Sequence, residues 1–226
     1  MSQFDQEKKA VLEACLWLSG QGYFGSQRGS GGNISVRLPD GAMAITPTSV
    51  QYQDLSAHDI CVVGPDHQQI PVPGCLKPSI EAGLHSIIYR NRPDVQAVVH
   101  THQIYGSVFG VINTPIPALF DEVSYALGPV IDIIPYAISG SPELAAHVGG
   151  KLSNNANAYI IQNHGILALG KNLDKAILHA ELLEKLAHTY YLALATGRPV
   201  TTLPQATVDF AQGLRNADVQ EAVKKL

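Results

Sequence analysis

The spacing of apolar residues predicts a helix at the start of the chain and a hairpin after it. From Asp5 to Leu18, apolar positions recur at helical intervals, and Gly20 and Gly22 end the run. A Gly- and Ser-rich loop follows, and apolar and polar residues then alternate as they do in half-buried strands. Pro39-Asp40-Gly41 has the composition of a turn. We therefore expect short strands at residues 34–38, 42–46 and 60–63.

Helices and strands alternate through the rest of the chain. Pro78 suits the first turn of a helix that continues to Asn91, and Ser141-Pro142 and Asn172 have the composition of helix starts. Strands are expected at residues 95–102, 130–135, 158–162 and 165–169, and helices at 142–152, from Asn172 to Gly197 and within 203–226. This interleaving predicts an α/β or α+β fold. Because no linker or repeat interrupts the chain, we expect a single domain over residues 1–226.

The composition excludes several classes of partner. Lys and Arg number 15 against 19 Asp and Glu, so the formal net charge is −4, and the chain lacks the basic field that nucleic-acid binding needs. No apolar run approaches the roughly 20 residues of a membrane span, and the first residues lack the apolar core of a secretory signal. We therefore expect neither a nucleic-acid nor a membrane partner.

Cysteines and histidines add information about compartment and chemistry. Cys15, Cys61 and Cys75 form no CxxC pair, so we expect reduced, structural thiols in a cytoplasmic protein. Nine histidines are many for a chain in which 15% of the residues are charged. We infer that some of the histidines serve a chemical function.

The most informative histidines are His100 and His102, which stand two apart on a predicted strand. Side chains at this spacing point to one face, so both imidazoles can reach one metal ion. His164 lies between two further predicted strands and would supply a third ligand. Three imidazoles with an open position form a catalytic zinc site. The alternative is that each histidine is a structural residue of a strand or a turn.

Glu81 lies at the start of the predicted helix that precedes the histidine strand. A carboxylate beside a metal can coordinate it or act as a base. A glutamate at a helix start also complements the helix dipole, which is the alternative. His85 stands four residues later on the same helical face. We expect His85 to support the site or the fold and not to bind the metal.

Three turns rich in small polar residues are candidates for binding an anion. The loop Ser30-Gly31-Gly32-Asn33 could present backbone N–H groups and small side chains to it, although it lacks the lysine of a Walker motif. The other two turns contain Thr46-Pro47-Thr48-Ser49 and Ser79. The alternative for each is a flexible turn without a ligand.

Six short motifs follow one another along residues 8–196. They are Ser30-Gly31-Gly32-Asn33-Ile34-Ser35, Ile45-Thr46-Pro47-Thr48, Pro78-Ser79-x-Glu81, Arg92-Pro93-Asp94, His100-Thr101-His102 and Asn163-His164-Gly165. In order and spacing this set resembles the class II aldolase/adducin family, and most closely its bacterial fuculose-phosphate aldolase branch. Each motif is short, but the set is specific because order and spacing both match.

The resemblance implies a metal centre and a phosphate site. In that family the HxH pair and the later histidine bind Zn²⁺, which here names His100, His102 and His164, and another divalent transition metal is the alternative. The family's catalytic glutamate corresponds to Glu81, which would coordinate the resting metal and transfer a proton once substrate displaces it. The substrate phosphate would be held by Ser30, Asn33, Thr48, Ser49 and Ser79.

The resemblance also implies a fold and an assembly. The family fold is a three-layer αβα sandwich around a central mixed, largely antiparallel sheet. Family members usually form a fourfold-symmetric tetramer with the sites at subunit borders. We therefore expect this fold and a homotetramer.

Two features depart from the family pattern. Ile80 replaces the second serine of the family's Pro-Ser-Ser-Glu motif, which removes one phosphate donor. The family's proton-donating tyrosine after the Ile-Pro-Ala segment is absent, and its C-terminal tyrosine is unmatched because no tyrosine follows Thr201. Asp121 and Glu122 follow that segment instead, and an acidic group there could donate the proton or belong to a surface pair.

These inferences together predict a zinc-dependent aldolase. It would cleave a small phosphorylated ketose, of the fuculose- or ribulose-1-phosphate type, to dihydroxyacetone phosphate and an aldehyde. Breaking the bond next to the ketone leaves an enediolate, whose charge a Lewis-acidic metal stabilises. The alternatives on the same site are a decarboxylase, dehydratase or epimerase of a related sugar phosphate or keto-acid. A non-catalytic, adducin-like binding domain is a further alternative.

Overall fold

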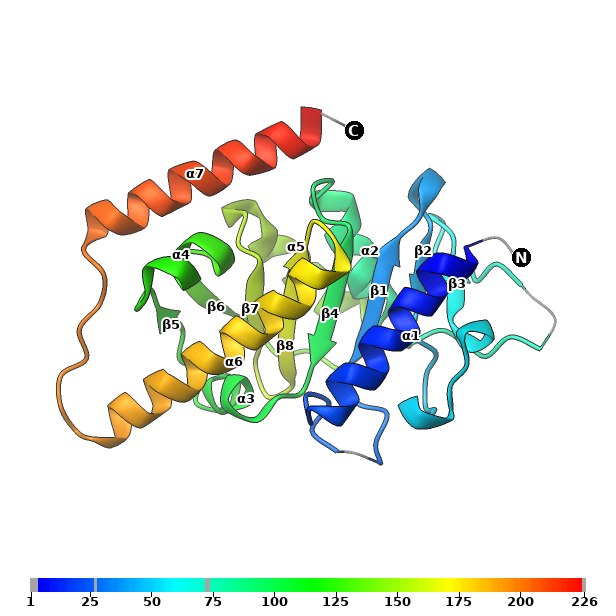
Figure 1. The fold of residues 1–226 in the computed structure, drawn as a ribbon, viewed down its shortest axis with the longest axis horizontal. Coiled ribbons are helices and arrows are strands. Elements are labelled where there is room, and N and C mark those ends of the chain that lie inside the picture. Colours follow the sequence, from blue (N-terminus) through cyan, green and yellow to red (C-terminus); the bar gives the residue numbers. More distant parts are fainter. Residues whose placement is uncertain (1–3, 27, 72–73, 225–226) are drawn as a thin grey trace.

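One mixed sheet runs through the computed structural model, which describes residues 4–26, 28–71 and 74–224 (Figure 1). Its eight strands lie in the order β3-β2-β1-β4-β8-β7-β6-β5. The pair β6 and β7 is parallel, and the other neighbours are antiparallel. The strands are β1 (Asn33–Arg37), β2 (Met43–Ile45), β3 (Cys61–Val63), β4 (Ala97–Thr101), β5 (Ile116–Pro117), β6 (Val130–Ile134), β7 (Ala158–Ile161) and β8 (Gly165–Gly170).

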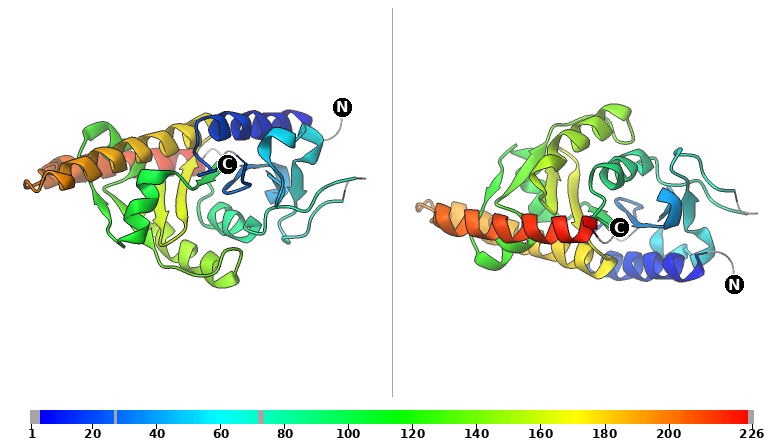
Figure 2. Two further views of the ribbon diagram at one scale, coloured as in Figure 1. Left: turned by 90° about the horizontal axis from the view of Figure 1, so that it is seen from below. Right: turned by 90° about the horizontal axis from the view of Figure 1, so that it is seen from above.

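Helices cover both faces of this sheet (Figure 2). One face carries α1 (Asp5–Gly20), α3 (Ile104–Val111), α4 (Asp121–Leu127) and α6 (Leu173–Ala195). The other face carries α2 (Ala82–Asn91) and α5 (Pro142–Lys151). The last helix, α7 (Gln205–Lys224), packs against α4, and residues 225–226 of the predicted terminal segment lie outside the described residues. The predicted three-layer fold with a mixed, largely antiparallel sheet is confirmed.

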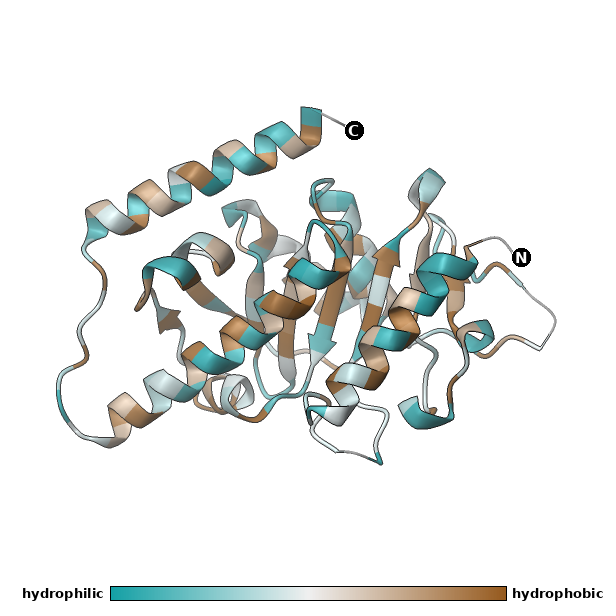
Figure 3. Cartoon of the chain, in the orientation of Figure 1, coloured by the Kyte–Doolittle hydropathy of each residue, from teal (hydrophilic) through white to brown (hydrophobic). Residues whose placement is uncertain are grey.

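Alternating side chains of the central strands fill two separate cores. Val99 of β4 and Ile34 of β1 face the layer of α1 and α6, whereas Val98 of β4 and Leu167 of β8 face the layer of α2 and α5. All four are buried, because successive side chains of a strand point to opposite faces. Figure 3 accordingly shows apolar colour along the central strands. Strand β4 is therefore fixed on both faces just before it reaches its histidines.

The start of α2 differs from the prediction. Pro78 does not lie in the first helical turn, because α2 begins at Ala82. The backbone N–H of Ser79 donates to the carbonyl of Thr46 at 3.0 Å, and Pro78 forms a β-bridge with Pro47. This pairing keeps the segment extended, and it places two of the predicted anion-binding turns side by side.

Three elements, α3, β5 and α4, have no counterpart in the sequence pattern. Helix α3 has the sequence Ile-Tyr-Gly-Ser-Val-Phe-Gly-Val, in which apolar residues lie on most sides and two glycines weaken the helical preference. Strand β5 has 2 residues and α4 has 7. Segments this short show no clear period, so tertiary contacts decide their structure.

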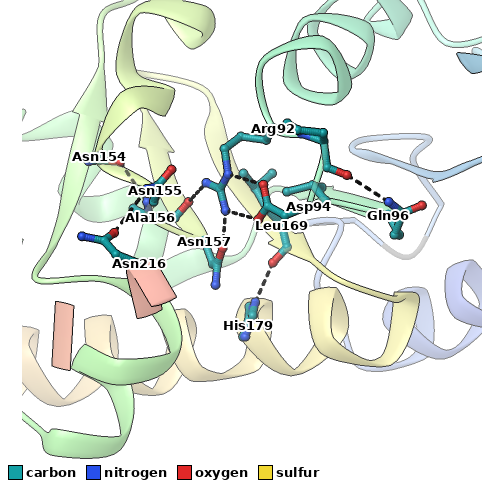
Figure 4. A network of polar contacts seen from close by, with 12 residues as sticks. Arg92, Asp94, Gln96, Asn154, Asn155, Ala156, Asn157, Leu169, His179 and Asn216 are labelled. Atoms are coloured by element: carbon teal, nitrogen blue, oxygen red, sulfur yellow. Dashed lines mark hydrogen bonds and ion pairs between the residues drawn. The ribbon is translucent and has the colours of Figure 1, made fainter. Parts of the chain in front are cut away.

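A buried arginine ties the segment before β4 to the segment before β7 (Figure 4). Arg92 is 2% exposed and donates two hydrogen bonds to Asp94, at 2.8 and 2.7 Å. It also donates to the Ala156 carbonyl at 2.8 Å and to Asn157 Oδ1 at 3.1 Å. A guanidinium that is paired with a carboxylate and hydrogen-bonded through all three nitrogens can be buried without the cost of an isolated charge. Arg92, one of the motif residues noted in the sequence, therefore has a structural role here.

Two further predictions concern membrane crossing and the state of the cysteines. Within residues 4–26, 28–71 and 74–224, no helix combines the length and the apolar character that a membrane crossing requires. Cys15, Cys61 and Cys75 are free thiols. Burial raises the pKa of Cys61 to about 12, which agrees with an inert structural thiol.

Candidate active site

Three imidazoles converge at the carboxyl end of β4. His100 is the fourth residue of β4, His102 follows the strand, and His164 comes from the tight turn between β7 and β8. His100 Nε2 lies 3.1 Å from His102 Nε2 and 3.3 Å from His164 Nε2. Asn163 adopts the left-handed conformation, with φ of 52°, that makes this turn, and asparagine tolerates it better than most residues. The structure thus brings together the three histidines that the sequence named.

The donor set fits a divalent metal of the zinc type. His100 Nδ1 donates to the Ile166 carbonyl at 2.7 Å, so its Nε2 carries a lone pair and faces the other two rings. Nitrogen ligands about 2.0–2.1 Å from a tetrahedral Zn²⁺ lie about 3.3 Å from one another. The separations of 3.1 and 3.3 Å found here are close to that value. The three ligand atoms all lie within 4.8 Å of one another, with His100 buried and the other two partly open.

Two glycines allow neighbouring loops to approach the histidine strand closely. A side chain on Gly165 would strike the Thr101 carbonyl and would lie 2.7 Å from His102 Cδ2. Gly32 has a φ of +71°, and a side chain there would lie 2.5 Å from the His100 carbonyl oxygen. Glycine is the residue that permits such close backbone approach and such dihedral angles. The motif glycines therefore serve to pack the loops onto the histidine strand.

Glu81 lies beside the histidines, at the residue that precedes α2. Its Oε2 is 3.3 Å from His100 Nε2 and its Oε1 is 3.4 Å from His164 Nε2. The carboxylate accepts one hydrogen bond on each oxygen, from Asn33 Nδ2 to Oε2 and from Ser139 Oγ to Oε1, both at 2.7 Å. Glu81 is 5% exposed. The predicted glutamate therefore completes a set of four possible metal ligands.

The protonation of the site follows from burial and these contacts. Burial alone would raise the pKa of Glu81, but His100, the hydrogen bond from Ser139, His164 and the hydrogen bond from Asn33 together lower it well below its usual range. Burial lowers the pKa of His100 to about 4 and also lowers that of His102. At neutral pH the site holds the ionised Glu81 carboxylate and the uncharged imidazoles of His100 and His102. These three groups can bind a divalent cation without releasing protons.

The five candidate phosphate-binding residues lie on three segments. Ser79 is buried, and its Oγ accepts a hydrogen bond from the backbone N–H of Glu81 at 3.2 Å. Thr48 lies beside it, because the Thr48 N–H donates to the Lys77 carbonyl at 3.0 Å. Thr48 Oγ1 and Ser49 Oγ are 3.3 Å apart, and Ser30 is exposed. Asn33 differs from the others, since its amide is bound to Glu81.

The two acidic residues after the Ile-Pro-Ala segment are not brought to the histidines within one chain. Asp121 and Glu122 are exposed residues of α4. Glu122 lines a cavity of about 630 Å³ together with Asp94 and Val95. These two residues precede β4, whereas the histidines are at the other end of that strand. Among the described residues, neither acidic side chain forms a hydrogen bond or ion pair with the three histidines.

Ser139 is a site residue that the sequence analysis does not name. It lies between β6 and α5, in the segment Ala137-Ile138-Ser139-Gly140-Ser141, and donates to Glu81. Gly140 packs on the backbone of Ile80, since a side chain there would lie 2.9 Å from the Ile80 carbonyl oxygen. Small residues after a predicted strand are the signal that points to this loop. Ile80 itself is 63% exposed.

Comparisons with known proteins identify relatives of this chain. A family model described as the class II aldolase and adducin N-terminal domain matches residues 9–191. The L-fuculose phosphate aldolase of Escherichia coli O6:H1 is 36% identical over 197 residues, which are 86% of this chain and 87% of that protein. The 5-methylthioribulose-1-phosphate/5-deoxyribulose-1-phosphate aldolase of Rhodospirillum rubrum is 37% identical over 175 residues, 77% of each chain. A solved structure of an L-fuculose 1-phosphate aldolase matches with a TM-score of 0.85 at 28% identity, over 94% of this chain and 97% of that chain.

These relatives are aldolases, and aldolases are lyases. The prediction of an enzyme of the lyase class is therefore confirmed, and class II aldolases use a divalent metal. The family predicted from the sequence motifs is confirmed as well. This chain belongs to the class II aldolase and adducin N-terminal domain family.

Proposed function

We propose that this protein is a zinc-dependent aldolase that cleaves a small phosphorylated ketose to dihydroxyacetone phosphate and an aldehyde. The observation that carries the proposal is the convergence of three imidazoles and the Glu81 carboxylate at one end of β4. The relatives named as fuculose phosphate and ribulose phosphate aldolases support the substrate class.

His100, His102 and His164 would hold the metal. When bound there, a divalent ion supplies Lewis acidity that lowers the energy of the negative charge developing on the substrate's ketone oxygen. Zn²⁺ suits a site of imidazole ligands, and another divalent transition ion is the alternative. The buried apolar cores on both faces of β4 fix the strand that carries His100.

Glu81 would transfer the proton at carbon. In the direction of synthesis its carboxylate takes a proton from the carbon next to the ketone, and in the direction of cleavage it returns that proton to the same carbon. A base must be ionised at neutral pH, and the lowered pKa of Glu81 meets this requirement. Its two hydrogen bonds, from Asn33 and Ser139, hold the oxygens toward the histidines.

The phosphate would be held by neutral donors. Ser30, Thr48, Ser49 and Ser79 lie on the three polar turns, and two of those turns are joined by the bridge between Pro47 and Pro78. Donors without charge position the phosphate without competing with the metal for the ketone oxygen. Asn33 would contribute from β1, where it lies directly opposite His100 in the register of the sheet.

The second proton transfer, at the hydroxyl of the cleaved bond, would use Asp121 or Glu122 of a neighbouring copy. This arrangement requires an assembly with sites at the subunit borders, and we infer a homotetramer. Exposed apolar side chains on α3 and the end of α6 support contact between copies, among them Ile104, Val111, Ile112, Tyr191 and Leu192. The three free thiols support a reducing, cytoplasmic location.

Product analysis tests the proposal. The zinc-loaded protein is incubated separately with fuculose-1-phosphate, ribulose-1-phosphate and phosphorylated keto-acids, and dihydroxyacetone phosphate, aldehyde and CO₂ are measured. We expect dihydroxyacetone phosphate and aldehyde in equal amounts from a ketose phosphate. Release of CO₂ without triose phosphate, or isomerised sugar without cleavage, would instead identify a decarboxylase or an epimerase on this site.

A further inference from the structure

Behind Glu81, four buried polar side chains form a continuous hydrogen-bonded chain between α2 and β1. Tyr89 Oη lies 2.7 Å from Ser35 Oγ, which lies 2.7 Å from His85 Nδ1. His85 Nε2 contacts Asn33 Oδ1, and Asn33 Nδ2 donates to Glu81 Oε2 at 2.7 Å. Ser35 and His85 are completely buried, Asn33 is 3% exposed and Tyr89 is 7% exposed. Water therefore does not compete for these contacts.

The Glu81 carboxylate determines which atom donates in each hydrogen bond of this network. An ionised carboxylate only accepts, so the amide NH₂ of Asn33 must face Glu81 and its carbonyl oxygen must face His85. That oxygen also only accepts, so His85 carries its hydrogen on Nε2. The neutral ring then accepts at Nδ1 from the Ser35 hydroxyl, and Ser35 accepts from the Tyr89 hydroxyl.

This order has a consequence for the Glu81 carboxylate. An asparagine amide can rotate by half a turn at little steric cost, which exchanges its oxygen and nitrogen. In the rotated form Asn33 Oδ1 would face Glu81 Oε2, and two acceptors would repel each other. The N–H of His85 opposes that rotation because it can bond to the oxygen and cannot bond to the NH₂ group. Burial lowers the pKa of His85 to about 3, so the ring stays neutral at working pH.

We infer that His85 is a positioning residue for Glu81. Its Nε2–H, donated to Asn33 Oδ1, stabilises the amide orientation in which Asn33 holds the carboxylate toward the three histidines, and the contact of Ser35 with Nδ1 holds the His85 ring in place. The inference rests on the proposed role of Glu81 at a metal centre. His85 would thus act on the metal site through Asn33 and Glu81, without contacting the metal.

Substitution of His85 tests this inference by two separate readouts, zinc affinity in competition with a chelator and the kinetic constants. His85→Phe keeps a buried ring but removes the N–H, and we expect zinc affinity and kcat to fall about 10- to 100-fold. His85→Gln places an amide N–H near the position of Nε2 and should recover most of both losses. Ser35→Ala removes the hydrogen bond at Nδ1 that holds the ring in place and should show a smaller loss in the same direction.

The matched control is His179→Phe. His179 is also a buried histidine, 7% exposed, but its Nδ1 donates to the Leu169 carbonyl away from the site. This variant should lose stability and keep the zinc affinity and kcat of the wild type within about 2-fold. Equal losses of zinc affinity in the two Phe variants would show that the loss comes from disturbed packing and not from the missing N–H of His85.

Two results overturn the inference while the proposed function stands. They are an active, zinc-binding His85→Phe variant, and failure of His85→Gln to recover more than His85→Phe does. If His85→Phe does not fold, an unchanged Ser35→Ala variant overturns it equally. A wild-type protein that neither binds zinc nor turns over a ketose phosphate would overturn the proposed function itself, and with it the role of His85.

Discussion

At the scale of residues, the chemistry of the site centres on Glu81. Its carboxylate is within 3.4 Å of two imidazole nitrogens and receives one neutral hydrogen bond on each oxygen. These contacts hold the group ionised although burial opposes the charge. A carboxylate in this setting can serve as a metal ligand and as a base, and its surroundings suit either role.

Replacing this carboxylate separates its two roles. We expect Glu81→Gln to reduce turnover by about 1,000-fold or more, since an amide cannot accept the proton. Zinc should stay bound at one ion per chain, because the three histidines remain. Steady-state kinetics and metal analysis of the purified variant measure both effects. Near-normal turnover would show that another group moves the proton.

A second residue-scale prediction concerns the pH dependence of stability. Burial lowers the pKa of His179 to about 4, below the value of about 6.5 in an unfolded chain. The unfolded state therefore binds more protons between these values, and stability falls as pH falls through this window. We expect His179 alone to lower the free energy of unfolding by about 2 kcal/mol between pH 7 and pH 5.

Urea unfolding at both pH values measures this loss. His179→Asn keeps a donor for the Leu169 carbonyl but does not titrate, so its stability should fall less than that of the wild type over the same interval. Parallel losses in the two proteins would exclude His179 as the cause.

His100 and His102 could be predicted from sequence as a pair because they stand two apart on one strand. His164 lies 64 residues after His100, and it is the family resemblance that joins it to the pair. Ser139 could not be predicted in the same way, because its contact with Glu81 joins positions 58 residues apart. The hydrogen bond from Asn33 to Glu81 is likewise a tertiary contact, and no local sequence pattern specifies it.

At the scale of elements, the site depends on how closely β8 approaches β4. The strands pair from Ala97 with Gly170 to Thr101 with Ile166, and Gly165 then passes directly over the histidine rings. The long, periodic helices and the apolar strands are predictable from sequence because their patterns extend over several turns or residues. The bridge that delays the start of α2 to Ala82 is not predictable, since it pairs residues 47 and 78.

Gly165→Ala tests this close approach. Its new methyl group would strike the Thr101 carbonyl and press on both His102 and His100. We expect zinc affinity to fall at least about 10-fold, because a shift of the rings disturbs the ligand geometry. Gly83→Ala is the control, since a side chain at Gly83 meets nothing within 4 Å. Chelator competition on both variants gives the comparison, and equal affinities would contradict this account of Gly165.

At the scale of the whole molecule, the candidate donor Glu122 and the histidines lie toward opposite ends of strand β4. Glu122 lines a cavity with the residues before β4, and the histidines follow that strand. We expect a homotetramer in solution, with a light-scattering mass about four times that of one chain. Only an assembly can supply Asp121 or Glu122 to a neighbour's site. A monomer with full activity would exclude both residues as donors.

The prediction of a single domain over residues 1–226 stays a prediction, although one sheet connects the described strands. The layers themselves could be predicted from the family resemblance, whereas the position of α7 against α4 could not. Helix α7 has 3 buried residues among 20, so its sequence carries a weak amphipathic signal.

The most direct test of the central claim is a titration of the metal-free protein with Zn²⁺ while the release of dihydroxyacetone phosphate from a ketose 1-phosphate is followed. Three imidazoles at one end of β4 provide one candidate metal site among the residues that the structure describes. The account predicts no release before zinc is added, a linear rise, and a plateau at one ion per chain. Full activity in the metal-free protein, or no activity at any zinc content with any ketose phosphate of the panel, would contradict it.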